Sequence, residues 1–241
     1  IIRKRGGSFH MNEKLKKGQT LSTKLGVMVT IKEWLAEGGQ GDVYLVEYAG
    51  EEKVLKWYKK AAIGDNSQMF YDNLVDNIHR KRPDSHFIWP EDITPYNNGQ
   101  YGYIMEVLPA GYYEVGDFMN KVVMFKNYRI MIDAALNMIK AFRILHNAGL
   151  FYQDINEGNF AIDPNNGDVK IMDNDNVAPS GKSTGVLGKP RYMAPEIVIG
   201  ISNHQRAIET KADYVPPFVM PSVQSDLYSM AVILYILFTL N

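Results

Sequence analysis

The stretch YQDINEGNF, residues 152–160, contains residue types that could carry out metal-assisted chemistry. Asp154 is followed five residues later by Asn159, after a segment with a helical pattern. Carboxylate and amide oxygens are ligands that Mg²⁺ accepts, so the pair could hold a metal ion together with a phosphate group. Asp, Asn and Gly are also the usual residues of a surface turn. Taken alone, the pair leaves both interpretations open.

Three further motifs have residues suited to phosphate or metal binding. EGGQGDVYLV places Gly38 and Gly41 between two strand-like runs, where backbone N–H groups could approach phosphate oxygens. Lys56 lies near the end of the strand-like run EEKVLKWY, and Asp173 ends the run VKIMD. Each motif also has an ordinary alternative: a hairpin turn, a solvated edge-strand lysine and a turn aspartate.

The first part of the chain reads mainly as short strands. Runs at 29–37 and 42–50 flank the glycine cluster, and a tight hairpin leads into 51–58. A helix is expected over 66–82, because the pattern stops before Pro83. FIWP (87–90) and YGYIMEVL (101–108) are two further strand-like runs.

After residue 108 the pattern becomes mainly helical. Residues 127–149 predict a helix that ends at Gly149. The apolar positions that predict its buried stripe are Ile132, Leu136, Ile139, Phe142 and Leu145. Two short strands, FAID and DVKIMD, follow, and then a long loop leads to a terminal apolar helix. That helix, residues 230–240, is too short to span a bilayer.

Composition narrows the class of protein. The 241 residues include 26 basic and 27 acidic side chains, a net charge of −1, so no nucleic-acid or membrane partner is indicated. Cysteine is absent, which excludes disulfides and thiolate metal sites and fits a cytoplasmic location. No signal peptide is recognised, and residues 1–26 are expected to be an N-terminal extension, in part a remnant of cloning.

The order of the motifs is more specific than any one of them. Glycine loop, strand lysine, Asp-to-Asn loop, strand-end Asp and the tripeptide 194–196 (Ala-Pro-Glu) follow one another as in protein kinases. From about residue 27 to its end the chain therefore resembles the eukaryotic-type protein kinase family, including its bacterial serine/threonine branch. The resemblance implies an α+β fold with a sheet lobe at 27–107 and a helical lobe at 108–241. The helical lobe would be incomplete after the helix that starts near Asp226.

The resemblance also implies roles for the motif residues. Gly38 and Gly41 would cover the ATP phosphates, and Lys56 would bind the α- and β-phosphates. Asn159 and Asp173 would hold Mg²⁺, or Mn²⁺ in its place. Asp154 would orient a substrate hydroxyl and accept its proton. The remaining residues expected around ATP are Leu35, Val43, Val54, Met105, Glu106, Leu108 and Ala161, with Glu106 and Leu108 offering backbone hydrogen bonds to adenine.

Several positions depart from the family pattern. Gln153 replaces the arginine that reads a phosphorylated loop, which argues against control through Ser180, Ser183 or Thr184. Asn174 replaces the phenylalanine that packs between lobes, which implies a wetter contact, and Asp175 takes a glycine position. Asn156 replaces a lysine that touches the γ-phosphate.

Two lysine pairings are left open. The helix at 66–82 has no glutamate for Lys56, so Asp72 or Asp76 is the available partner, and we favour Asp76. Lys189, which stands where a threonine is common, could restore the charge lost at Asn156. Its alternative is an exposed lysine that pairs with a loop carboxylate.

The last part of the chain contributes one anchor and one insertion. Asp226 is expected to cap the last helix and to hold the backbone of the catalytic loop. The insertion at 201–224 would be either a partner surface or a plain surface loop.

The expected function is ATP- and Mg²⁺-dependent phosphoryl transfer to serine or threonine hydroxyls, with a protein as substrate. The rival is a pseudokinase scaffold that binds nucleotide or a partner, and its support is the set of departures at residues 153, 156 and 174. A small-molecule kinase of related fold is disfavoured by PRYMAPE, residues 190–196.

Overall fold

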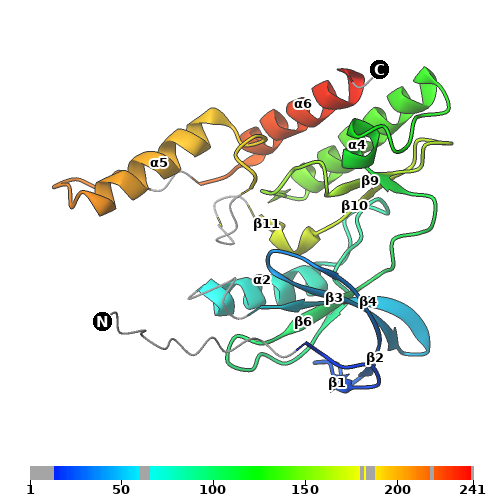
Figure 1. Ribbon diagram of the computed structural model, residues 1–241. Helices are drawn as coiled ribbons and strands as arrows, with labels where there is room; N and C mark the ends of the chain where they lie inside the picture. The colour runs from blue at the N-terminus through cyan, green and yellow to red at the C-terminus, as the bar shows by residue number, and fades with distance from the viewer. Residues whose placement is uncertain (1–13, 60–65, 180–181, 183–187, 218–219, 240–241) are drawn as a thin grey trace, which may run out of the picture. The chain divides into compact units, whose positions relative to one another are not determined.

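The structure is a computed structural model that describes residues 14–59, 66–179, 182, 188–217 and 220–239. The chain divides into two compact units (Figure 1). The first comprises Ile1–Gln68 and Asp92–Ile104, and the second comprises Met69–Glu91 and Met105–Asn241. The sequence predicts a division near residue 107, whereas the segment 69–91 belongs to the second unit. The predictions that concern residues 1–11, Ser180, Ser183 and Thr184 lie outside the described residues.

A six-stranded sheet forms the first unit, in the order β1-β2-β3-β4-β6-β5. Its strands are β1 (Thr20–Ser22), β2 (Met28–Glu37), β3 (Gly41–Tyr48), β4 (Glu51–Tyr58), β5 (Asp92–Ile93) and β6 (Gly102–Met105). Val29, Ile31, Tyr44 and Val46 alternate along β2 and β3 and are buried on one face, as a half-covered sheet requires. The predicted β3–β4 hairpin is confirmed.

One strand in this region was not predicted, and one strand prediction is wrong. β1 lies inside the predicted N-terminal extension, where Thr20 pairs with Thr30 of β2. FIWP is not a strand. Instead Phe87 forms an isolated bridge with Ile171, and its ring packs edge-on against Trp89. Phe87 and Trp89 are buried in the core of the second unit. A short run of buried apolar residues has the same sequence pattern as a buried strand, which explains the wrong prediction.

The second unit is mainly helical, with two small sheets. The helices are α2 (Ser67–Arg80), α3 (Val115–Met119), α4 (Tyr128–Asn147), α5 (Pro195–Glu209) and α6 (Val223–Thr239). The strands are β7 (Tyr113–Glu114), β8 (Leu150–Phe151), β9 (Phe160–Ile162), β10 (Val169–Ile171) and β11 (Ala178–Pro179). The strand orders are β10-β9-β7 and β11-β8. The predicted helices at 66–82 and 127–149 and the predicted strands after residue 159 are confirmed.

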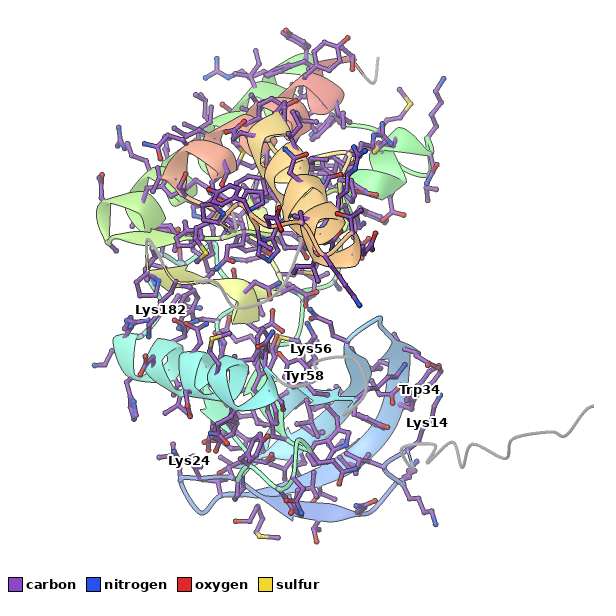
Figure 2. All side chains as sticks on the ribbon, turned by 90° about the vertical axis from the view of Figure 1, so that its left-hand side faces the viewer. Lys14, Lys24, Trp34, Lys56, Tyr58 and Lys182 are labelled. Carbon is purple, nitrogen blue, oxygen red and sulfur yellow. The ribbon has the colours of Figure 1, made fainter. Side chains whose placement is uncertain are left out.

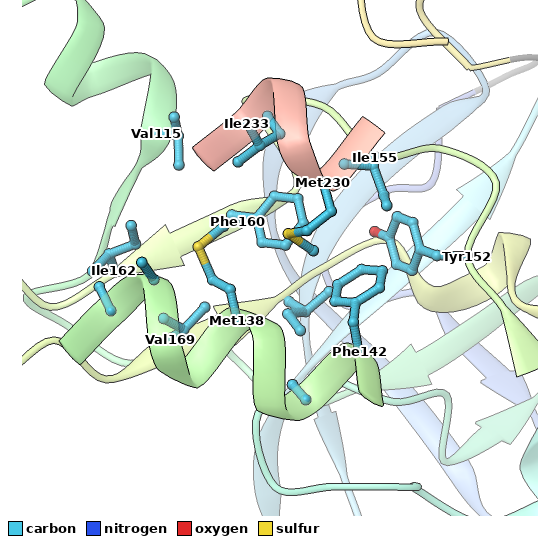
Figure 3. Packing of buried hydrophobic residues seen from close by; sticks show 14 of the residues in the cluster. Val115, Met138, Phe142, Tyr152, Ile155, Phe160, Ile162, Val169, Met230 and Ile233 are labelled. Atoms are coloured by element: carbon cyan, nitrogen blue, oxygen red, sulfur yellow. The ribbon is translucent and has the colours of Figure 1, made fainter. Parts of the chain in front are cut away.

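The buried face of α4 differs from the predicted stripe. Phe142 and Leu145 are buried, but Leu136 and Ile139 are 45% and 44% exposed. The buried face is instead Met131, Ala134, Ala135, Met138, Ala141, Phe142 and Leu145. Alanines let the neighbouring elements approach closely, and a pattern based on large apolar residues does not detect them. Met138 and Phe142 lie beside Phe160, Met230 and Ile233 in this core (Figure 3).

The segment before α6 is partly helical. α5 begins with Pro195 at a first-turn position, which suits proline because its missing N–H has no intrahelical partner there. It continues to Glu209, so residues 201–209 of the insertion at 201–224 are helical. In the part of the chain that the structure describes, no helix combines the length and apolar character needed to cross a bilayer.

Candidate active site

The loop of residues 152–159 is ordered by its own asparagines. Asn156 donates its side-chain amide to the carbonyl oxygen and to Oδ1 of Asp154, at 3.1 and 3.0 Å. Asn159 donates to the same carbonyl oxygen at 2.8 Å. Both asparagines are buried. The loop is therefore a rigid support for the Asp154 carboxyl group.

The electrostatic surroundings of Asp154 disfavour its charged form. Burial of the carboxyl group raises the pKa of Asp154 above its ordinary value, and the negative charges of Asp173 and Asp175 act in the same direction. Hydrogen bonds from Asn156 and Asn159 oppose the rise. A carboxylate with a raised pKa is a stronger base, as a group that accepts a proton requires.

Asp173 lies next to Asn159 because of the β9–β10 hairpin. Phe160 pairs with Ile171, and the N–H of Met172 donates to the carbonyl oxygen of Asn159 at 2.9 Å. Asp173 itself has a left-handed backbone, with φ of 50° and ψ of 48°. That conformation is uncommon outside glycine and often marks a functional position. The hairpin register therefore brings the two predicted metal ligands together.

The donor set of this pair fits a hard cation. Asn159 uses its Nδ2 on Asp154, which orients its Oδ1 as the atom available to a metal, and Asp173 supplies a carboxylate. Among the described residues, no cluster of three or more His, Asp or Glu side chains could hold a metal. The protein would thus provide two ligands, and Mg²⁺ in such sites takes the others from phosphates and water.

Asp226 anchors the loop from α6. Its carboxylate accepts hydrogen bonds from the N–H groups of Tyr152 and Gln153 at 2.6 and 3.1 Å, and from a ring nitrogen of His146 at 3.0 Å. The predicted role in holding the loop is confirmed. The predicted N-cap role is wrong, because α6 begins at Val223 and Ser222 stands before it, with its hydroxyl 3.5 Å from the N–H of Ser225.

A family model for the protein kinase domain matches residues 29–241. The chain belongs to the protein kinase domain family. Mouse protein kinase C delta type is 26% identical over 181 residues, 71% of this chain and 26% of that protein. The Drosophila melanogaster cGMP-dependent protein kinase, isozyme 1, is 32% identical over 96 residues, 35% of this chain and 12% of that protein. The chain thus spans about a quarter or less of these curated relatives.

Solved structures agree on the fold. The crystal structure of the Mycobacterium tuberculosis PknI kinase domain, in its C20A_R136A double mutant, covers 95% of this kinase domain and 79% of its own chain, with a TM-score of 0.65 and 18% identity. Vaccinia related kinase 3 covers 92% and 68%, with a TM-score of 0.63 and 15% identity. The predicted family and the predicted protein-kinase-like α+β fold are confirmed.

The kinase-specific departures are accommodated inside the second unit. Asn174 is buried and donates its amide to the carbonyl oxygens of Ile88 and Ile171, at 2.6 and 2.7 Å. Both donors of this amide are therefore taken by carbonyl oxygens of the protein, and the wetter contact between lobes stays a prediction. Gln153 donates to the carbonyl oxygen of Asn176 at 3.1 Å. The hydroxyl of Tyr152 donates to the carbonyl oxygen of Met172.

Gly188 and Lys189 border the catalytic loop. A Cβ at Gly188 would lie 2.9 Å from the carbonyl oxygen of Gln153 and 3.6 Å from Oδ1 of Asp154, so only glycine fits there without a shift. The amine of Lys189 lies 3.2 Å from Oε1 of Glu157 and is half-exposed. This is the geometry of the alternative considered for Lys189, and its catalytic role stays a prediction.

The phosphate-loop candidates lie in the first unit. Gly38 donates its N–H to the carbonyl oxygen of Gly41 at 2.8 Å, which closes the β2–β3 turn. A Cβ at Gly41 would lie 2.5 Å from the carbonyl oxygen of Trp57, so close strand packing alone requires this glycine. Lys56 is buried on β4 near Tyr58, and its amine lies 3.5 Å from Oε1 of Gln40 (Figure 2). Their contact with phosphate stays a prediction.

The other predicted ATP contacts are divided between the units. Leu35 (45% exposed), Val43 and Val54 belong to the first unit, and Met105, Glu106, Leu108 and Ala161 belong to the second. The carboxylate of Glu106 accepts two hydrogen bonds from Arg82. That all seven of these predicted residues surround one ATP molecule stays a prediction.

The two carboxylates proposed for Lys56 are on α2. Asp72 is exposed, and Asp76 lies 3.6 Å from Arg80 and 3.7 Å from Lys182. A pair with Lys56 stays a prediction for both. Sequence reasoning missed Asn73 and Asn77, two buried polar side chains that lie one turn apart on α2. Their four-residue spacing beside the apolar Phe70 and Leu74 could have identified them as buried hydrogen-bond donors.

Proposed function

We propose that this kinase domain transfers the γ-phosphoryl group of ATP to serine or threonine hydroxyls of a protein, with Mg²⁺. The observation that carries the proposal is that Asn156 and Asn159 hold Asp154 in a loop next to the β9–β10 hairpin, whose register brings the backbone of residue 172 to Asn159. Family membership supports phosphoryl transfer, and the restriction to serine and threonine rests on the resemblance to that branch of the family.

In the proposed mechanism each residue acts mainly by position and charge, as is general for phosphoryl transfer. Asp154 accepts a hydrogen bond from the attacking hydroxyl, orients it and takes its proton. Asn159 and Asp173 would hold the metal ion, which would neutralise the phosphate charge. Lys56 would bind the α- and β-phosphates.

A scaffold function is the second candidate. Its support is that Gln153, Asn156 and Asn174 replace side chains that active members usually retain, and that each donates its side-chain amide to an oxygen of the protein. Such a protein would bind nucleotide or a partner and would transfer no phosphate.

The first prediction separates these functions by removal of the metal. Purified protein incubated with labelled ATP, Mg²⁺ and acceptor peptides that contain Ser, Thr or Tyr should label the Ser and Thr peptides. EDTA or Asp173→Ala should abolish labelling, because the phosphate charge is then not neutralised. Nucleotide that raises Tm without labelling any peptide would instead support the scaffold.

A second prediction concerns Lys189. If Lys189 restores the charge lost at Asn156, Lys189→Ala should lower kcat by about 10²–10³-fold, as loss of one transition-state donor does. Glu157→Gln is the matched control, because it releases the lysine without removing it and should keep kcat near normal. A Lys189→Ala variant with normal kcat would leave only the pair with Glu157.

A further inference from the structure

Three side-chain amides hold the backbone just after Asp173. Asn73 and Asn77 of α2 both donate Nδ2 to the carbonyl oxygen of Val177, each at 2.8 Å. Asn73 also reaches the carbonyl oxygen of Asp175 at 3.4 Å. From the catalytic loop, Gln153 donates Nε2 to the carbonyl oxygen of Asn176 at 3.1 Å. Three consecutive carbonyl groups are therefore bound by side chains from two separate elements of the same unit.

Because these hydrogen bonds are buried, they restrict the conformation of the backbone that they hold. Asn73, Asn77 and Gln153 are 5%, 0% and 9% exposed, and residues 174–176 are buried too. The two asparagines stand four positions apart on α2, so they share one face. Both lone pairs of the Val177 carbonyl oxygen are used by them. A carbonyl group that lost these donors in a buried place would have no water to replace them.

The bound segment follows directly on Asp173 in the chain. Residues 174–176 form a short 3₁₀ turn whose N-terminal flanking residue is Asp173, in the left-handed conformation. The segment then enters β11, which pairs with β8 next to the catalytic loop. With β10 before it and the bound carbonyl groups after it, Asp173 has little freedom to change φ, so its Cα–Cβ bond keeps one direction.

We propose that Asn73, Asn77 and Gln153 form an amide clamp that positions Asp173 as a metal ligand. The three are positioning residues, which act through the backbone and touch no substrate. Because the donors are neutral amides, the clamp is permanent and requires no charged modification. The expected effects on kcat and Mg²⁺ requirement rest on the proposed function. The expected effect on hydrogen exchange does not depend on it.

The test uses near-isosteric variants that replace a donor by an acceptor: Asn73→Asp, Asn77→Asp and Gln153→Glu. Asn137→Asp is the matched control, because Asn137 also donates Nδ2 to a backbone carbonyl oxygen, that of Gly167, at 2.9 Å. Hydrogen exchange of the amides at 174–178 is measured on the full chain without nucleotide. The kcat and the Mg²⁺ concentration for half-maximal rate are measured on the same samples.

The clamp predicts faster exchange at 174–178 in each clamp variant, with exchange at 160–171 unchanged. It also predicts a kcat lower by about tenfold and a higher Mg²⁺ requirement, as loss of one buried hydrogen bond implies. Asn137→Asp should change none of these. If an aspartate variant does not fold, Asn73→Ala or Asn77→Ala, which adds no charge, takes its place.

The outcomes separate the clamp from the proposed function. Unchanged exchange at 174–178 in the clamp variants overturns the clamp, whether or not the protein transfers phosphate. Faster exchange in a protein whose wild-type form transfers no phosphate supports the clamp and overturns the kinase function. Faster exchange with an unaltered Mg²⁺ requirement overturns the positioning of Asp173.

Discussion

Asp154→Asn should lower kcat by about 10²–10⁴-fold, the range for loss of a positioned proton acceptor. Asparagine has nearly the same shape, so Asn156 and Asn159 can still bond to the backbone carbonyl oxygen of residue 154. The loop should therefore keep its conformation, and the KM for ATP should change little. Steady-state kinetics with varied ATP and with varied acceptor would measure both quantities.

The matched control for this variant is Asp163→Asn. Asp163 lies in the β9–β10 turn, where its Oδ1 accepts the N–H of Asn165, a role that asparagine can fill. Its kcat should equal that of the wild type. An Asp154→Asn enzyme that retains kcat within threefold would refute Asp154 as the proton acceptor, and the proposed mechanism with it.

The second large effect is on stability. Asp226→Ala should lower the free energy of unfolding by about 3 kcal/mol or more, because each buried N–H group that loses its acceptor costs about 1–3 kcal/mol. Asp226 is 2% exposed and accepts the N–H groups of Tyr152 and Gln153 as well as the His146 contact. Removal of the carboxylate would leave these donors buried without a partner. Urea unfolding of the purified variant would measure the loss.

Two variants calibrate that result. Asp226→Asn keeps one carbonyl acceptor and should lose less stability than Asp226→Ala. Asp213→Ala removes an exposed carboxylate and should change the free energy of unfolding by less than about 0.5 kcal/mol. If Asp226→Ala were as stable as Asp213→Ala, the loop would be held by something other than α6.

The sequence alone determined the features that depend on neighbouring residues. The hairpin between β3 and β4, the helices at α2 and α4 and the hairpin of β9 and β10 follow from local periodicity and turn residues. The approach of Asp173 to Asn159 also follows from a short hairpin, which requires no distant partner. The order of the kinase motifs therefore identified the family and predicted the principal site residues.

Only the tertiary structure decided which polar groups meet across long separations. Asn73 and Val177 are 104 residues apart, and Asn174 and Ile88 are 86 apart. The buried face of α4 and the partners of Asn174 were equally hidden, and the sequence offered Lys189 a loop carboxylate without identifying Glu157. The reason is physical: a buried amide or carboxylate is stable beside whichever complementary group the packed core brings to it, and local sequence does not contain that information.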